Sequence, residues 1–267
     1  MTTTTEVSTS DTSDPDQNTS LTERSLDEVL LSYCAEQGIE DSLSYVYKNL
    51  ETGSVVSHRA DVGYPAASTV KLAMALYCYD RATAGDLDLD QSLTYDETRD
   101  WEAGAGLLAG ATDGDQFTIS QLLSSAIIHS DNIATNMIFR YWRETGSSLS
   151  TRIDDAYGLD YSDGGILTAA QGIALLERAY RNPDDNPYYD RLLNDLLNST
   201  WDDYTTHDLP VATANKYGSL RCCHHELSIV YADTPYLLSV YSASLERPQA
   251  NLRRIGRLVY DWHQANN

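Results

Sequence analysis

The order in which hydrophobic patterns follow one another along the chain restricts its fold more than any other feature. Residues 26–59 contain a helical spacing of apolar residues and then two strand-like runs joined across Glu51-Thr52-Gly53. From Ser68 to about Thr200 the spacing is helical, and strand patterns return after Pro210. Strands towards both ends of a chain, with helices between them, are typical of an α+β fold.

This order predicts two lobes that together make one catalytic domain. Residues 21–67 and 205–267 would form an α/β lobe, in which an antiparallel sheet is flanked by N- and C-terminal helices, and residues 68–204 would form an all-helical lobe. A cleft between two such lobes is a natural place for an active site. We expect strands at 43–50, 54–59, 211–216, 226–231 and 236–242. We expect a first helix from Leu26 to a stop at Gly38, and further helices at 68–84, 119–128, 132–142, 168–180, 187–197 and 247–264.

The first twenty residues are rich in Thr, Ser and Asp and contain no aromatic residue, so we expect residues 1–20 to be a disordered tail. They also lack the positively charged and apolar regions of a signal peptide. Two possibilities stay open: the protein remains in the cytoplasm, or it is exported and the export signal is missing from this chain.

Acidic residues outnumber basic residues by 40 to 18, which gives a formal net charge of -22. Such a surface argues against nucleic acid or an anionic membrane as a partner, because phosphate binding needs a basic footprint. The acidity reflects either adaptation to high salt or an ordinary solvated surface. Since no run approaches the roughly 18 apolar residues of a membrane span, we expect a soluble protein with a small-molecule substrate. The oligomeric state stays open.

The first candidate motif is Ser68-Thr69-Val70-Lys71. If Ser68 begins a helix, Lys71 lies on the same face one turn further on. A serine hydroxyl needs a neighbouring base to become a nucleophile, and a buried lysine can lose its proton near neutral pH. The backbone N–H of Ser68 would help to hold an oxyanion. Taken alone, the spacing also fits a capped helix with a surface lysine.

The second motif, Ser130-Asp131-Asn132, lies between two expected helices. Ser130 can pass a proton to a leaving nitrogen, and Asn132 can offer its amide to a substrate carbonyl. The same residues make a good helix N-cap, and that alternative stays open.

The third motif, Lys216-Tyr217-Gly218-Ser219, is expected at the end of a strand. Lys216 would supply a cation for a substrate carboxylate, and Gly218 would let the substrate lie against the strand edge. The N–H of Ser219 would be the second oxyanion donor. The alternative is a surface lysine followed by a glycine that ends the strand.

Lysine usage connects the first and third motifs. The chain has only three lysines, Lys48, Lys71 and Lys216, and its other 15 basic residues are arginine. Arginine cannot act as a base, because its pKa exceeds about 12. Two of the three lysines therefore stand where the chemistry needs a lysine, which random placement explains poorly.

The motifs S-x-x-K, S-D-N and K-[T/S]-G, in this order, resemble those of class A β-lactamases and penicillin-binding proteins, the penicillin-recognising serine hydrolases. The resemblance runs from about residue 22 to the C-terminus. It implies a serine that is acylated by a β-lactam or by an acyl-D-Ala-D-Ala peptide. It also implies roles for individual residues: Ser68 as nucleophile, Lys71 as its base, Ser130 as proton relay, Asn132 as substrate contact, and Lys216 with Gly218 as the β-strand wall.

Two departures from the family pattern stand out. Tyr217 replaces a small hydroxyl residue. Its phenol could still donate a hydrogen bond to the substrate, but its bulk would narrow the site if it points inward; the alternative is that it packs inside the protein. Class A β-lactamases hydrolyse the acyl-enzyme with a water activated by a glutamate on a loop after the S-D-N helices, but this chain has no glutamate between Glu144 and Glu177. Deacylation is therefore expected to be slow or to use another base. The carboxylates available in that stretch are Asp154, Asp155, Asp160 and Asp163.

We expect no metal and no cofactor, because His224-His225 and Cys222-Cys223 are adjacent rather than spaced like zinc ligands. A disulfide between Cys34 or Cys78 and the later cysteine pair stays open. The leading hypothesis is a β-lactam-hydrolysing serine enzyme acylated at Ser68. The alternatives are a D-Ala-D-Ala-type peptidase or esterase with the same acylation machinery, and a β-lactam-binding protein with slow or no deacylation.

Overall fold

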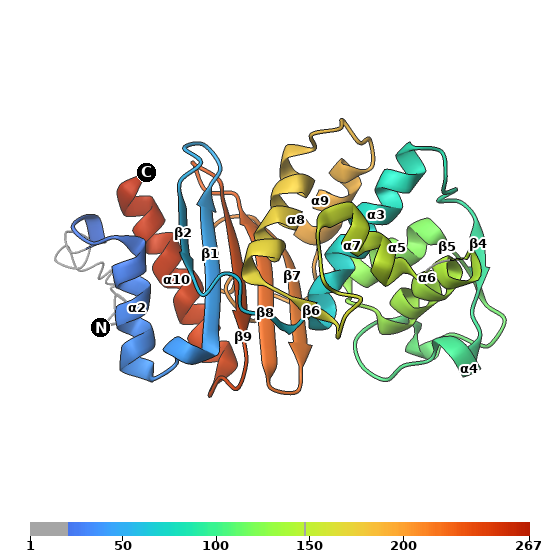
Figure 1. The fold of residues 1–267 in the computed structure, drawn as a ribbon, viewed down its shortest axis with the longest axis horizontal. Coiled ribbons are helices and arrows are strands. Elements are labelled where there is room, and N and C mark those ends of the chain that lie inside the picture. Colours follow the sequence, from blue (N-terminus) through green and yellow to red (C-terminus); the bar gives the residue numbers. More distant parts are fainter. Residues whose placement is uncertain (1–20, 147) are drawn as a thin grey trace, which may run out of the picture.

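A five-stranded antiparallel sheet lies at the centre of the protein, with the strand order β2-β1-β9-β8-β7 (Figure 1). The structure is a computed structural model that describes residues 21–146 and 148–267, so the tail expected at residues 1–20 lies outside the described residues. The strands are β1 (Leu43–Asn49), β2 (Val55–His58), β7 (Thr213–Leu220), β8 (Cys223–Val230) and β9 (Tyr236–Ser242).

Two helices from opposite ends of the chain cover one face of this sheet. Helix α2 (Leu26–Gln37) packs beside α10 (Pro248–Asn266), as Figure 1 shows. Successive strand residues point to opposite faces, and in β1 Tyr45 and Tyr47 join the core under these helices whereas Val46 joins the core on the other face. A capping box at Ser25 begins α2. Gly38 ends the helix in the left-handed conformation, and this stop was predicted from the sequence.

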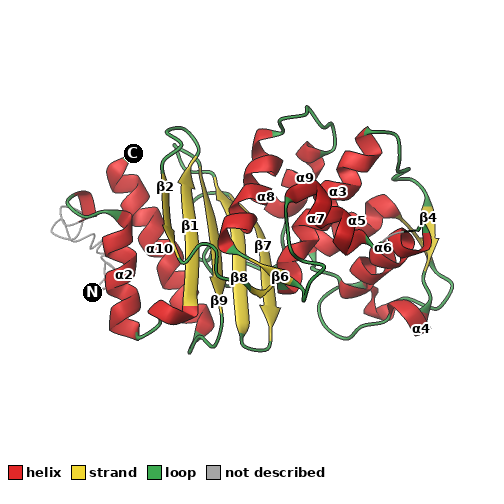
Figure 2. Ribbon diagram, viewed as in Figure 1, coloured by secondary structure: helices red, strands yellow, loops and turns green. Residues whose placement is uncertain are grey.

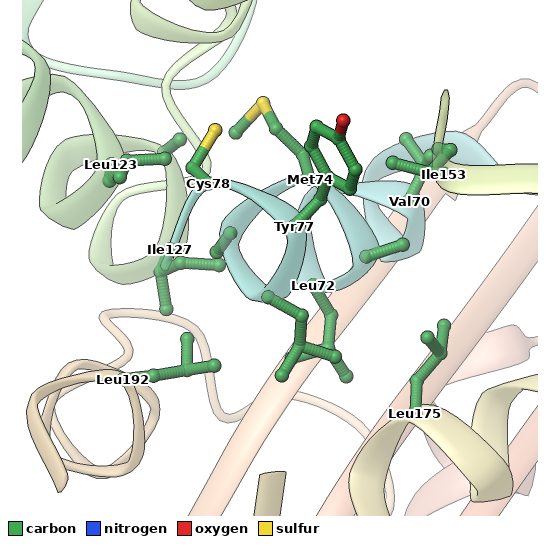
Figure 3. Packing of buried hydrophobic residues seen from close by; sticks show 14 of the residues in the cluster. Val70, Leu72, Met74, Tyr77, Cys78, Leu123, Ile127, Ile153, Leu175 and Leu192 are labelled. Carbon is green, nitrogen blue, oxygen red and sulfur yellow. The ribbon is translucent and has the colours of Figure 1, made fainter. Parts of the chain in front are cut away.

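The other face of the sheet carries the helical lobe (Figure 2). Its central helix is α3 (Val70–Thr83), which is buried at every position from Val70 to Tyr79. Figure 3 shows side chains of neighbouring helices, among them Leu123, Leu175 and Leu192, arranged around it. A helix enclosed in this way holds its first turn rigidly. The remaining helices are α4 (Glu97–Asp100), α5 (Ile119–Ile128), α6 (Asn132–Glu144), α7 (Leu149–Tyr157), α8 (Ala169–Arg181) and α9 (Tyr189–Leu197).

The predicted α+β class, with an antiparallel sheet between terminal helices and a helical lobe, is confirmed. The sequence did not predict α4 or α7. It also did not predict two short strand pairs: β3 (Tyr64–Pro65) with β6 (Ile166–Leu167), and β4 (Ser92–Thr94) with β5 (Gln116–Thr118). Within the described residues, no helix has both the length and the apolar character that crossing a membrane requires. All four cysteines are free, so neither candidate disulfide forms.

The two strand boundaries at the turn between β7 and β8 were predicted wrongly, and they matter for the site. The sequence places Lys216 at a strand end, because Gly218 looks like a terminator. In the structure β7 continues to Leu220, which pairs with Cys223 across a tight turn to β8. Lys216 therefore lies in the middle of the strand, and β7 is an edge strand of the sheet.

Candidate active site

Ser68 lies in a short 3₁₀ turn, Ala67–Thr69, immediately before α3 begins at Val70. The turn is tied down at Ala66, whose N–H donates to the carbonyl of Gly165 at 2.8 Å and whose carbonyl accepts from the Thr69 hydroxyl at 2.6 Å. Ala67 has a φ of +48°, a conformation that L-residues adopt only when the surroundings enforce it. The sequence suggested that Ser68 begins an α-helix. In the structure, Ser68 instead belongs to a constrained turn that precedes the helix.

Strand β7 packs directly on this turn, and Gly218 makes the approach possible. A Cβ at Gly218 would lie 3.1 Å from the carbonyl oxygen of Ala66 and 3.2 Å from the Cβ of Ala67. These contacts are tighter than nearly all real Cβ contacts. The structure therefore gives this glycine a packing role, while its predicted contact with substrate stays a prediction.

Lys71 is buried on the first turn of α3, where its amine lies between two residues of the second motif. Nζ donates to the Ser130 carbonyl at 2.6 Å and to Oδ1 of Asn132 at 2.8 Å, and it lies 3.2 Å from the Ser130 hydroxyl. Burial lowers the pKa of Lys71 to about 8, even though the nearby carboxylates Asp131 and Glu102 favour the charged form. Near neutral pH an appreciable fraction of this lysine is uncharged and able to accept a proton.

The Ser130-Asp131-Asn132 turn serves both of the roles that the sequence left open. Asp131 is the N-cap of α6 and accepts from the N–H of Ala134 at 3.0 Å. Its neighbours face Lys71, as described above, and Ser130 holds a φ of +53°. The cap and the contact with the lysine are therefore two functions of one turn.

Lys216 lies behind Lys71 and is fully buried. Its Nζ donates to the Tyr217 carbonyl at 3.0 Å and sits 4.3 Å from the centre of the Tyr217 ring. Burial and the positive charge of Lys71 lower the pKa of Lys216 well below its ordinary value, whereas Glu226 acts in the opposite direction. Protonating both of these neighbouring buried lysines at once is energetically unfavourable, because each positive charge is poorly solvated and the two repel each other.

Tyr217 is buried, with its ring stacked on Trp201 at 4.8 Å between centroids. Burial raises the pKa of its phenol, and the Ser130 side chain acts against that rise. The phenol therefore stays protonated at neutral pH and is close enough to Ser130 to affect it. Its predicted contact with substrate stays a prediction.

A cavity of about 410 Å³ opens beside the turn that carries Ser68. Of the residues that the sequence predicted for the site, four line this cavity: Ser68, Lys71, Asn132 and Ser219. The others lie behind its wall: Ser130 and Lys216 beside Lys71, Tyr217 beside Lys216, and Gly218 beneath the turn. The sheet side of the cavity ends at Leu220, and the helical side includes Thr135, Asn136, Phe139, Tyr161 and Gly164.

The sequence did not predict that Glu102 lines the cavity. It comes from the segment after α4, and one of its carboxylate oxygens, Oε2, accepts from the Asn136 amide at 2.9 Å. Two glycines bring this segment against the S-D-N turn: a Cβ at Gly104 would lie 2.7 Å from the Asn132 amide, and one at Gly106 would lie 2.2 Å from the Asp131 carboxyl carbon. Closely spaced glycines beside a glutamate are the pattern from which this approach could have been inferred.

The four aspartates considered as replacements for a loop glutamate are absent from the described lining of the cavity. The carboxylate of Asp154 accepts from the N–H groups of Tyr161 and Ser162, at 2.9 and 2.8 Å, and so holds the loop that includes Tyr161. Its position indicates a structural role in this loop.

The adjacent histidines hold backbone and side-chain partners in place. Nδ1 of His225 accepts from the Ser242 N–H at 3.1 Å, so Nε2 must carry the proton that it donates to the Pro65 carbonyl at 2.8 Å. Burial lowers the pKa of His225 to about 4, which keeps the ring neutral. His224 lies 2.9 Å from the Tyr204 hydroxyl. His225 thereby fixes the strand that leads into the Ser68 turn.

Comparisons with known proteins agree with this architecture. Among solved structures, a mutant of PBP-A in an acyl-enzyme complex with penicillin G superposes with a TM-score of 0.78 at 20% identity, covering 91% of this chain and 98% of that chain. A β-lactamase from Sphaerobacter thermophilus gives 0.77 at 16% identity, covering 87% and 96%. An ancestral class A β-lactamase gives 0.73 at 20% identity, covering 89% and 99%. At these identities the structures show a shared fold.

The sequence matches none of the curated proteins. The model of the beta-lactamase enzyme family, however, matches residues 22–263, which is nearly all of the chain that the structure describes. Together with the fold, this match establishes that the chain belongs to the beta-lactamase enzyme family.

Proposed function

We propose that the protein is a serine hydrolase of the class A β-lactamase type, which is acylated at Ser68 by a β-lactam and hydrolyses it. One observation carries the proposal: Lys71 lines the same cavity as Ser68 and has a pKa lowered to about 8 by burial. A lysine with that pKa supplies the base that a serine nucleophile requires. Membership of the family agrees with this chemistry.

In the proposed acylation, neutral Lys71 takes the proton of the Ser68 hydroxyl, and Oγ bonds to the β-lactam carbonyl carbon. The N–H groups of Ser68 and Ser219 stabilise the oxyanion. The C–N bond then breaks, and the proton passes from Lys71 through the Ser130 hydroxyl to the leaving nitrogen. The distance of 3.2 Å between Nζ of Lys71 and Oγ of Ser130 supports this relay. Lys71 ends the step uncharged.

The remaining predicted residues fit around this reaction. Asn132 would contact a substrate carbonyl with its amide, and Lys216 would become the cation for a substrate carboxylate, whose negative charge favours the protonated amine. Ser219 belongs to an edge strand, where alternate N–H groups have no partner strand. Because the cavity is lined from both sides, we also propose that residues 21–67 and 205–267, with residues 68–204, act as one catalytic domain.

A second candidate function is a β-lactam-binding protein, or a related peptidase or esterase, whose acyl-enzyme decays slowly. The absence of Asp154, Asp155, Asp160 and Asp163 from the described cavity lining favours it. The difference between the two candidates lies in deacylation alone.

The test is to incubate the protein with a chromogenic cephalosporin and to follow both colour and intact mass. Steady turnover supports the hydrolase, and a lasting adduct with little turnover supports the second candidate. Replacement of Ser68→Ala should abolish both adduct and turnover, whereas Ser92→Ala, at an exposed serine on β4 outside the cavity, should leave them unchanged. Labelling that survives in the Ser68→Ala variant would show that the nucleophile is misassigned.

A further inference from the structure

Glu102 is the one carboxylate among the described residues that line the cavity with Ser68 and Lys71. It does not belong to the loop between α7 and α8, in which the family resemblance would place a hydrolytic glutamate. It reaches the cavity from the segment between α4 and α5, on the side of α6. Glu102 therefore lies outside the stretch of sequence in which the family pattern has its hydrolytic glutamate.

Hydrogen bonds orient the Glu102 carboxylate but leave some of its acceptor positions unoccupied. Oε2 accepts from the Asn136 amide at 2.9 Å, and Oε1 has a long contact of 3.4 Å with the Asn132 amide. A carboxylate has about four acceptor positions, so these two contacts leave capacity for a water molecule. Glu102 also contributes to the electrostatic environment of Lys71, which places it near the reacting groups.

The backbone around Glu102 is held firmly against the S-D-N turn. The N–H of Asn132 donates to the Ala105 carbonyl at 3.0 Å, and Oδ2 of Asp131 accepts from the N–H groups of Leu107 and Leu108 at 2.7 and 2.8 Å. Asp131 is itself buried. A general base needs a defined position relative to its proton donor. This network fixes the segment that follows Glu102, and the Asn136 amide orients the exposed carboxylate itself.

We propose that Glu102 is the general base of deacylation: it takes a proton from the water that hydrolyses the acyl-Ser68 ester. This inference rests on the proposed acylation of Ser68. The water oxygen bonds to the acyl carbon while its proton moves to the Glu102 carboxylate. The bond between the acyl carbon and Oγ then breaks, and the proton held by Glu102 passes to Oγ. The product leaves as a carboxylic acid, and both residues are restored.

Other groups in the cavity are less suited to this step. Burial, together with the charges of Asp154 and Glu102, raises the pKa of the Tyr161 phenol, so that Tyr161 stays protonated and cannot accept a proton at neutral pH. Lys71 is uncharged after acylation and is the remaining alternative base. The experiment must therefore separate Glu102 from Lys71, and a chemical role for Glu102 from a structural one.

The protein is acylated with benzylpenicillin, freed of excess ligand, and followed by intact mass as the adduct on Ser68 decays. Glu102→Gln should form the adduct at close to the wild-type rate but lose it 10²–10⁴-fold more slowly, the usual contribution of a general base. Glu102→Asp should recover part of the loss. Hydroxylamine, a neutral nucleophile that needs no base, should release the acyl group equally fast from the wild type and from Glu102→Gln.

The matched control is Glu97→Gln, which makes the same change of charge at an exposed residue of α4 outside the cavity, and it should decay like the wild type. Unchanged decay in Glu102→Gln would overturn the proposal and point to Lys71. Acylation slowed as much as deacylation, or slowed hydroxylamine release, would instead show that Glu102 only positions its neighbours. A wild-type adduct that never decays would also exclude a base in this position. If the wild type forms neither adduct nor product, acylation itself fails, which is a distinct result.

Discussion

The amine of Lys71 donates a hydrogen bond of 2.6 Å to the carbonyl oxygen of Ser130. Ser130 turns its carbonyl towards the lysine while holding a positive φ, a conformation that a non-glycine residue keeps only under constraint. This bond joins the helix that follows the nucleophile to the turn that would relay the proton. In the acylation proposed above, the protonation state of Lys71 sets the pH dependence of the reaction.

The first prediction concerns that pH dependence. Because neutral Lys71 is the reactive form and its pKa is about 8, acylation should accelerate as the pH rises through 8 and then level off. At pH 6 the rate should be about a hundredfold below the plateau, since each pH unit below the pKa reduces the neutral fraction tenfold. The measurement is the rate of adduct formation from pH 6 to 9.5. A flat profile would exclude Lys71 as the base, and Lys71→Arg should remove both the rise and most of the rate.

The second prediction concerns the contact between β7 and the Ser68 turn. Gly218→Ala places a methyl group within 3.1–3.2 Å of Ala66, Ala67 and Thr69. This overpacking should lower the free energy of unfolding by about 1–3 kcal/mol and slow acylation, because the turn that carries Ser68 must shift. Urea denaturation and adduct formation measure the two effects. Gly110→Ala meets no atom within 4 Å and should alter neither; equal effects at the two positions would contradict the steric argument.

The third prediction separates backbone strain from collision in the glycine segment. Gly106 and Gly114 have φ values of +128° and +93°, but only Gly106 has a neighbour, Asp131, where a Cβ would stand. Gly114→Ala should cost about 1–2 kcal/mol of unfolding free energy through strain alone. Gly106→Ala should cost more, and should also slow adduct formation because it displaces Asp131 and its turn. If urea denaturation gave similar losses of unfolding free energy for Gly106→Ala and Gly114→Ala, and both variants were acylated at the wild-type rate, the steric clash with Asp131 would be relieved without moving its turn.

The fourth prediction concerns Glu226, which is fully buried and accepts hydrogen bonds from Thr205 and Thr206. Burial raises the pKa of its carboxyl from 4.5 to about 7. Between these values the folded protein holds a proton that the unfolded chain has lost, so this group makes the free energy of unfolding fall as the pH rises from 4.5 to 7. The full effect is on the order of 3 kcal/mol. The free energy of unfolding of Glu226→Gln should not show this decrease with pH. In urea denaturation, the stability of the variant relative to the wild type should therefore increase from pH 5 to pH 8. Parallel curves for the two proteins would mean that Glu226 is charged at both pH values.

Much of the site could be predicted because its chemistry dictates residue type at short spacing. The candidate nucleophile and its candidate base are only three positions apart, so both lie in one short motif. Because the chain uses arginine almost everywhere, a lysine at a position where arginine could not act as a base is easy to recognise. The α+β class followed from the change in hydrophobic period, and the helix from Leu26 followed from the spacing of its apolar residues and its glycine stop. These inferences depend on local rules, which the folded protein obeys.

What the sequence concealed depends on contacts between distant segments. Gly218 resembles a strand terminator, yet it is a glycine because Ala66 and Ala67 press against it. Glu102 follows no hydrophobic period and reaches the cavity only because Gly104 and Gly106 let its segment lie on another turn. In both cases the decisive neighbour is tens of residues away or more, so no window of the sequence contains it.

The position of β1 in the sheet has a consequence for how the protein is made. This strand sits between β2 and β9, with Tyr45 opposite Val240, so the ribosome releases one partner long before it synthesises the other. Until the last strands emerge, the nascent chain contains Ser68 and Lys71 but lacks the strand that supports their turn. Contacts this remote in sequence form slowly and leave strand edges exposed meanwhile. The proposed acylation site is therefore expected to be complete only after the last strands have been synthesised and have joined the sheet.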